Sequence, residues 1–255
     1  MNKAVSFRGR FFFAMIEKIS FSLFGFELLE PMAFVSNAVV ALVCATGAFR
    51  AGKLGMSKWM IFFVAFALAS LSGAFSHLFW NYWGFAGKVI PWFFGVVASG
   101  FLTVVMIDLF DFRFVTRRLL HFLVVIKGVF VLFMAYTQWN FLFVAVDTIL
   151  SLFVACGIGT FVLYFKYKRK DLLLMLIGFL VMLPAAFVFL FKLDLHLWLN
   201  REDLSHFLIA SGLFFFVQGL PQIRNKNAVV ELLPLDAISD SSIMLGENSE
   251  EIVLK

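Results

Sequence analysis

Charged residues are scarce in this sequence: Asp, Glu, Lys and Arg make up 15% of its 255 residues, whereas a soluble domain averages about one quarter. Hydrophobic residues account for 62%, and a water-soluble globule of this length has too little interior to bury them. Cysteine is scarce too, and Cys44 and Cys156 both fall in apolar stretches, where a free thiol behaves as a small apolar residue. The two thiols therefore say nothing about the redox compartment.

The sequence does contain long apolar stretches along its whole length. Each is near the roughly 20 residues that cross about 30 Å of hydrocarbon. The stretches are continuous rather than alternating, which predicts helices and not barrel strands. We expect seven spans, at residues 31–49, 59–80, 89–107, 119–138, 139–165, 172–191 and 204–223. The predicted fold class is an all-α, polytopic bundle of seven transmembrane helices with an N-terminal interfacial amphipathic helix.

The two ends of the chain differ from this membrane domain, residues 30–224. Residues 1–29 interleave basic and aromatic residues, and Glu17-Lys18 interrupts the apolar core that a cleavable signal would need. An interfacial amphipathic helix is the better interpretation. Residues 225–255 are rich in acids and serine, which predicts a flexible acidic cytoplasmic tail that could bind a cytoplasmic partner.

The loops differ in charge, and this difference predicts the orientation. The first, third and fifth loops and the start of the tail hold twelve Lys and Arg residues, whereas the other three loops hold Lys88, Lys192 and Arg201. The positive-inside rule then places the C-terminus in the cytoplasm and the N-terminus outside. The net charge of +5 is explained by these loops, so a nucleic-acid partner is not indicated.

His77 is the first polar residue of interest inside the membrane domain, since ionisable residues there usually mark a site. It lies near the end of the second span, and Ser72, Ser76 and Asn81 are close enough in sequence to orient it or a bound water. A neutral imidazole is a good zinc ligand. The alternative is an interfacial histidine hydrogen-bonded near the lipid headgroups.

His206 is the second, at the entry to the seventh span. Asp203 precedes it by three residues and Glu202 by four, so either carboxylate shares a helical face with the imidazole. Such a pair can chelate a metal or act as a carboxylate and base couple. The alternative is a helix start with Asn200 as the N-cap, which accounts for the acids but not for His206. The predicted topology brings His206 level with His77, so the two could hold one ion.

Lys127 and Asp147 form the third group, in the middle of the fourth and fifth spans. An ion pair within the bundle is the structural explanation, and a proton relay is the functional alternative. A retinal protein is not expected, because the last span contains no lysine for a Schiff base.

Three short motifs in order resemble the alkaline ceramidase branch of a group of seven-helix membrane hydrolases and receptors that includes the adiponectin receptors. Glu30-Pro-Met-Ala-Phe-Val-Ser36-Asn37 looks like the family's opening of the first helix. Leu-Ser-Gly-Ala-Phe-Ser-His77 is similar to its Gly- and Ser-rich turn that closes on a histidine. The run that starts at His206 matches the character of its seventh helix. The resemblance covers the whole helical region.

The resemblance implies a zinc ion held by three histidines, with a Ser and an Asp completing the site. His77 and His206 would be two of the ligands. The third histidine falls on Glu202, the Asp on Lys88 and the Ser on Gly73. A site of two histidines and one carboxylate is also chemically reasonable for zinc.

Other residues complete this expected site. Asp203 is the alternative carboxylate ligand and His196 a reserve one. The acidic cluster that binds calcium in some ceramidases is not visible apart from Glu27 and Glu30, so calcium is not expected.

The favoured hypothesis is a zinc-dependent hydrolase that cleaves the amide of a ceramide or related membrane lipid. Zinc-bound water would attack the acyl carbonyl, Ser72 or Ser76 would stabilise the oxyanion, and Asp203 or Glu202 would shuttle the proton. The second hypothesis is a catalytically degenerate receptor or scaffold. The third is a small transporter with a path through Lys127 and Asp147.

Overall fold

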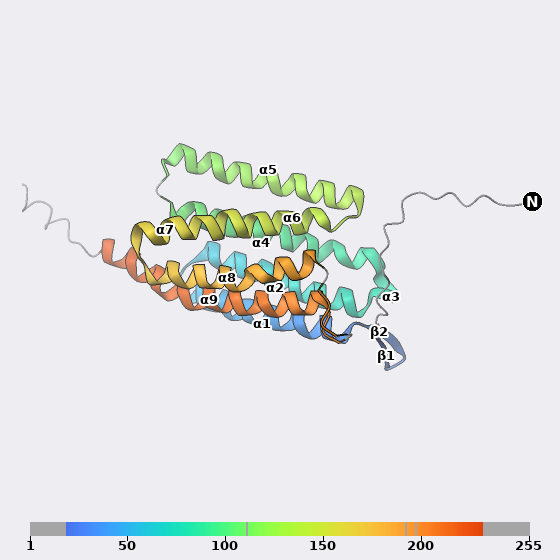
Figure 1. The fold of residues 1–255 in the computed structure, drawn as a ribbon. Coiled ribbons are helices and arrows are strands. Elements are labelled where there is room, and N and C mark those ends of the chain that lie inside the picture. Colours follow the sequence, from blue (N-terminus) through green and yellow to red (C-terminus); the bar gives the residue numbers. More distant parts are fainter. Residues whose placement is uncertain (1–18, 111, 192, 197, 232–255) are drawn as a thin grey trace, which may run out of the picture.

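The computed structural model describes residues 19–110, 112–191, 193–196 and 198–231, with side chains described up to residue 220. Within these ranges, seven helical segments are long and apolar enough to cross a membrane (Figure 1). The predicted all-α, seven-helix fold class is therefore confirmed. The chain is a multi-pass membrane protein.

Each predicted span overlaps one helical segment. The third segment begins at Trp80, nine residues before the predicted span, and the seventh helix runs to Glu231, eight residues past the predicted end. Five spans are single helices: α1 (Pro31–Lys53), α2 (Ser57–Leu78), α5 (Phe114–Gln138), α8 (Lys170–Leu190) and α9 (Arg201–Glu231). The third span is composite, with α3 (Trp80–Trp83), the 3-10 helix η1 (Gly84–Lys88) and α4 (Val89–Leu109). The fifth consists of α6 (Leu142–Leu150), the π-helix η2 (Ser151–Ile158) and α7 (Gly159–Tyr167).

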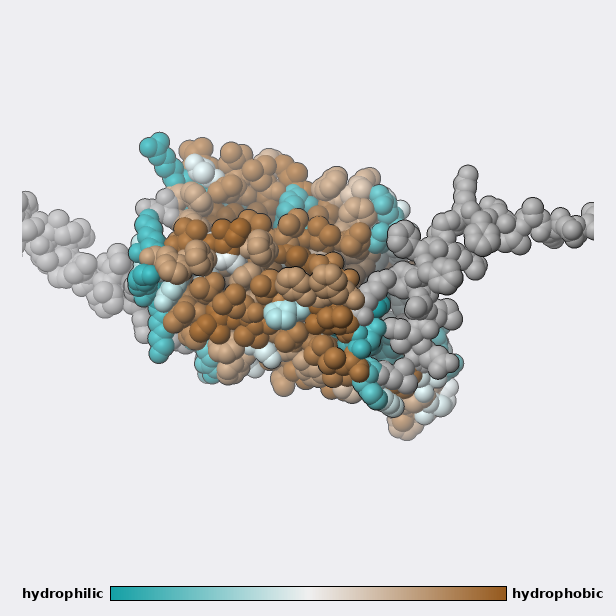
Figure 2. Space-filling view, viewed as in Figure 1, coloured by the Kyte–Doolittle hydropathy of each residue, from teal (hydrophilic) through white to brown (hydrophobic). Residues whose placement is uncertain are grey.

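Successive spans run in opposite directions, so the bundle has two distinct ends. The start of α1, the end of α2 and the start of α9 meet at one end, which also carries a short β-hairpin (Figure 1). We call this the hairpin end and the opposite one, where α9 finishes, the tail end. Figure 2 shows hydrophilic residues at both ends and a hydrophobic band between them, as expected for a protein that crosses a bilayer.

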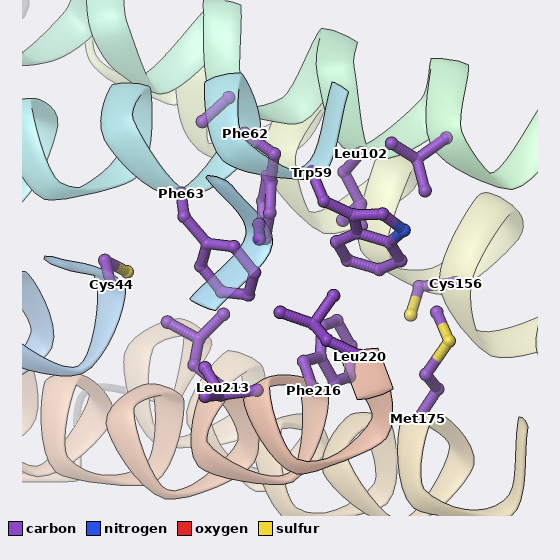
Figure 3. Packing of buried hydrophobic residues seen from close by; sticks show 14 of the residues in the cluster. Cys44, Trp59, Phe62, Phe63, Leu102, Cys156, Met175, Leu213, Phe216 and Leu220 are labelled. Atoms are coloured by element: carbon purple, nitrogen blue, oxygen red, sulfur yellow. The ribbon is translucent and has the colours of Figure 1, made fainter. Parts of the chain in front are cut away.

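Close packing of α1, α2, α8 and α9 holds the centre of the bundle. Figure 3 shows Phe62 and Phe63 from α2 facing Phe216 from α9 in the buried core. Glycines allow the closest approach: a Cβ on Gly178 of α8 would lie 2.6 Å from the carbonyl oxygen of Gly212 on α9. Such contacts matter because lipid supplies no hydrophobic force between helices.

The described part of the predicted N-terminal helix is a β-hairpin instead. Strand β1 (Ser20–Leu23) pairs antiparallel with β2 (Phe26–Leu29). The two turn residues, Phe24 and Gly25, have φ values of 52° and 82°, which is the positive-φ pair of a tight hairpin turn and incompatible with a helix. Residues 1–18 of the prediction lie outside the described residues.

The boundary of the predicted tail also changes. Helix α9 continues beyond residue 224 to Glu231, so a segment assigned to the acidic tail is helical. The sequence from Arg224 to Glu231 has neither a proline nor a glycine to stop the helix. The rest of the predicted tail, residues 232–255, lies outside the described residues.

Candidate functional site

Glu30 is held at the hairpin end by the turn from β2 into α1. Its backbone has φ 49°, its N–H donates to the carbonyl of Ile19 at 2.9 Å, and Pro31 opens α1 directly after it. The hairpin is itself anchored, because the backbone N–H of Glu27 donates to the hydroxyl of Tyr82 at 2.9 Å. Glu30 therefore enters the site from a fixed backbone.

His77 lies between Glu30 and Lys88. Its Nδ1 is 2.9 Å from Oε2 of Glu30, and its Nε2 is 2.9 Å from Nζ of Lys88. The carboxylate of Glu202, from the first turn of α9, reaches to 3.7 Å from the same Nε2. We call Glu30, His77, Lys88 and Glu202 the ion chain. It joins four segments of the sequence.

The chemistry of the partners fixes the protons in the ion chain. A lysine ammonium can only donate, so Nε2 of His77 accepts from Lys88. The ring proton then sits on Nδ1 and is donated to Glu30. Both nitrogens of a neutral His77 are thus occupied.

Asn200 and Asp203 shape the start of α9. The side-chain oxygen of Asn200 accepts from the backbone N–H groups of Glu202 at 2.8 Å and Asp203 at 3.1 Å. In return, Oδ2 of Asp203 accepts from the backbone N–H of Asn200 at 3.2 Å, which completes a reciprocal cap. The other oxygen, Oδ1, accepts from the hydroxyl of Ser36 at 3.2 Å. The cap predicted at Asn200 is present, and it accounts for the burial of Asp203 at 1% exposure.

His206 lies one turn further along α9, against α1. Its Nδ1 is 3.3 Å from both Oγ of Ser36 and Nδ2 of Asn37. The Asn37 amide nitrogen also donates to the carbonyl of Ala33 at 2.8 Å, so it is the donor and Nδ1 of His206 the acceptor. Ser36, Asn37, Asp203 and His206 form a second group, which we call the α1–α9 group. The side-chain oxygen of Asn200 accepts from the backbone of both Glu202 and Asp203, so the two groups are joined at the start of α9 and belong to one polar cluster.

The structure therefore brings four of the six predicted site residues together: His77, His206, Glu202 and Asp203. The two serines make no hydrogen bond to these four residues. Ser72 donates to the carbonyls of its own helix at Leu68 and Ala69. Ser76 is buried with no hydrogen-bond partner for its hydroxyl, 3.2 Å from where a Cβ on Gly87 would lie.

The reserve ligand is also separate. His196 lies in the exposed loop before α9, where its Nδ1 accepts from the backbone of Trp198 at 3.2 Å.

These side chains do not fit the zinc ion that the resemblance implied. Among the residues that the structure describes, no group of three or more His, Cys, Asp or Glu side chains is arranged to hold a metal ion. A zinc ligand needs a free lone pair about 2 Å from the metal, and the lone pair of His77 is taken by Lys88. The ammonium of Lys88 occupies that nitrogen of His77 in place of a metal ion.

Sequence reasoning missed Glu30, Ser36, Asn37 and Lys88 as members of the site. The signals were present, since the first three belong to the motif at the start of α1 and Lys88 follows His77 by eleven residues. Gly73 also borders the site, because a Cβ there would lie 3.4 Å from Oδ1 of Asn37.

Lys127 and Asp147 form an ion pair of 2.7 Å in the middle of the bundle, which is the structural explanation that the sequence suggested. Lys127 also donates to Ser151 at 2.8 Å, and Ser99 of α4 donates to the second oxygen of Asp147 at 2.5 Å. The pair ties α5, the most exposed span, to α4 and α6. It is separate from the polar cluster.

A seven-helix membrane protein with a polar cluster at one end is the class that this fold and site define. Residues 32–225 match the model of a family of unknown function, DUF6962. The match covers more than half of the chain, so the protein belongs to that family. No curated protein matches the chain.

Proposed function

We propose that this protein is a catalytically degenerate seven-helix receptor or scaffold, in which a lysine replaces the metal of a hydrolase. The observation that carries the proposal is the 2.9 Å contact between Nζ of Lys88 and Nε2 of His77. Lys88 stands at the position where the resembled family has an Asp. The ammonium supplies positive charge to the cluster, but it is a donor only and cannot activate a water as a Lewis acid does.

A receptor role follows from what the cluster connects. The ion chain joins the hairpin, α2, η1 and α9 through Glu30, His77, Lys88 and Glu202. A lipid with an anionic headgroup would compete with His77 for the ammonium of Lys88. Loss of that contact would release Lys88 of η1 from His77, which also contacts Glu202 of α9. Ligand binding therefore has a way to move α9.

The orientation belongs to the same proposal. Basic residues gather in the loops of the tail end, so the positive-inside rule places that end in the cytoplasm and the polar cluster outside. Labelling of single cysteines in intact cells tests this. An introduced cysteine at Gly25 should react with an impermeant maleimide, and one at Gly55 should react only after the membrane is permeabilised.

Metal content separates the receptor from the zinc-dependent ceramide hydrolase, which stays a prediction. Protein purified without chelators should contain far less than about one zinc per chain and should leave fluorescent ceramides intact. About one zinc per chain, lost in His206→Ala, together with ceramide cleavage, would overturn the proposal and favour the hydrolase.

Restoring the family's ligands is the sharper test. The triple variant Gly73→Ser, Lys88→Asp, Glu202→His replaces the three departures, and the space at Gly73 admits a Cβ at 3.4 Å from its nearest neighbour. We expect this variant to bind zinc. Lys88→Met is the matched control, because it removes the ammonium without adding a ligand, and it should stay free of zinc. Zinc binding by Lys88→Met as tight as by the triple variant would contradict the role given to Lys88.

A further inference from the structure

The tail end of the bundle presents a basic face that the proposed function does not use. It consists of five exposed residues: Lys53 at the end of α1, Arg113 and Arg118 at the start of α5, Lys168 between α7 and α8, and Lys170 at the start of α8. Figure 2 shows hydrophilic residues at this end of the molecule. We call these five residues the basic face.

Neighbouring acids do not neutralise the basic face. Two described acidic side chains lie at this end, and both have other partners. Asp108 pairs with Lys58 at 2.5 Å and with His121 at 3.2 Å, and Asp171 pairs with Arg169. Asp111 lies outside the described residues.

Aromatic rings are the contacts of several members of the basic face. Lys53 lies over Phe49 at 4.4 Å from the ring centroid, and Arg118 lies over Phe114 at 4.0 Å. Lys168 lies 4.2 Å from the centroid of the Phe165 ring. Such stacking positions the side chain but leaves its charge in place.

The acidic end of the chain leaves the bundle beside this face. Helix α9 packs between α1 and α8, whose ends carry Lys53 and Lys170. Residues 232–255 follow α9 and contain five acids, which are Asp236, Asp240, Glu247, Glu250 and Glu251, against one basic residue, Lys255. The two charges are complementary, and the acidic segment begins on the helix that leaves the bundle at this end.

We propose that residues 232–255 bind back onto the basic face of their own chain, with Glu247, Glu250 and Glu251 as the principal contacts. This inference is independent of the proposed function.

Chain geometry selects those three acids. A Cβ on Gly219 would lie 3.4 Å from the carbonyl of Asp171, so Gly219 is level with the basic face. Twelve residues of helix separate Gly219 from Glu231, which places the end of α9 roughly 18 Å beyond the face. Sixteen residues of random coil, the number between Glu231 and Glu247, would span roughly 22 Å on average, and effective concentration is highest when length matches span. Asp236 would need a nearly extended chain to return.

Zero-length carbodiimide cross-linking of the full chain in phosphatidylcholine nanodiscs tests the proposal. At low salt, peptides containing Glu247, Glu250 or Glu251 should be joined to Lys168, Lys170 or Lys53. At about 0.5 M salt these products should fall severalfold, because the Debye length shrinks to roughly 4 Å. The Lys58–Asp108 pair, at 2.5 Å, provides a positive control in the same digest.

Two variants keep the result specific. Glu247→Gln/Glu250→Gln/Glu251→Gln keeps the length of the segment and lies outside the bundle, so it should lose the cross-links while the Lys58–Asp108 product persists. Lys168→Gln/Lys170→Gln removes two lysines of the basic face and should lose most of the same cross-links.

Absence of the products from wild type when the control product forms would overturn the proposal. Products found only between light and heavy chains in a mixed sample would also overturn it, in favour of contact between copies.

Discussion

Replacing Lys127 by Met should destabilise the bundle more than any neutralisation of its partner. The ammonium of Lys127 lies 2.7 Å from Asp147, whose side chain is 2% exposed. Met has a similar volume, so Lys127→Met removes the charge and leaves a buried carboxylate with Ser99 as its remaining polar contact. Breaking a buried pair in this way costs about 3–5 kcal/mol, or roughly a 150- to 5,000-fold shift in the unfolding equilibrium.

Neutralising the other partner, by Asp147→Asn, should cost less free energy of unfolding because Lys127 is less buried than Asp147. The side chain of Lys127 is 37% exposed. After Asp147→Asn its flexible side chain can therefore snorkel, which carries the ammonium toward a more polar region. The double variant Lys127→Met/Asp147→Leu removes both charges and should lie within about 1–2 kcal/mol of wild type.

Reversible unfolding by SDS in mixed micelles, followed by tryptophan fluorescence, measures these differences. Trp59 and Trp92 are buried and report on the bundle. The reasoning is refuted if Lys127→Met and Asp147→Asn lose equal free energy, or if the double variant is as unstable as Lys127→Met alone. Equal losses would mean that Asp147 finds another partner or water when Lys127 is gone.

The same assay checks two further substitutions. Gly212→Ala should lose about 1–3 kcal/mol by overpacking, because its Cβ would clash with Met182 and lie 2.5 Å from the backbone oxygen of Gly178. The control Gly95→Ala, with its nearest atom at 3.6 Å, should be neutral or slightly stabilising. Asn200→Ala removes the cap of α9 and should lose about 1 kcal/mol, whereas Asn200→Asp should retain most of it; equal loss in both would contradict the capping role.

Hydropathy alone was enough to predict the seven spans, because each helix must satisfy its backbone within lipid and so needs a continuous apolar stretch. Hydropathy does not report the hydrogen-bond pattern, which is why the π-helix Ser151–Ile158 and the break of the third span at Gly84–Lys88 were not predicted. The β-hairpin was missed for a related reason. Four-residue strands give too short a pattern to outweigh the helical interpretation of the aromatic and basic residues around them.

The site was predicted in part, and the difference lies in side-chain direction. Spacing placed Glu202, Asp203 and His206 on one face of a helix, and alternating topology brought them to the end that holds His77. Ser72 was misjudged because five residues of helix turn it about 140° away from His77. Lys88 was visible as a departure from the family pattern, but no pattern in one sequence shows where a lysine side chain points.

The charge balance of the polar cluster gives a physical reason for a lysine at this position. Glu30, Glu202 and Asp203 bring three carboxylates to the ends of α1 and α9, and carboxylates gathered at the membrane boundary are costly without a cation. A divalent metal would supply two charges but would exchange with the solvent and depend on supply. The ammonium of Lys88 supplies one charge, is covalently attached, and holds His77 in a single tautomer through a 2.9 Å contact. In the proposed receptor, the ammonium of Lys88 therefore has two effects. It keeps the polar cluster assembled at all times, and it leaves the cluster without an activated water. A variant that regains zinc should also need zinc to hold its helix ends together.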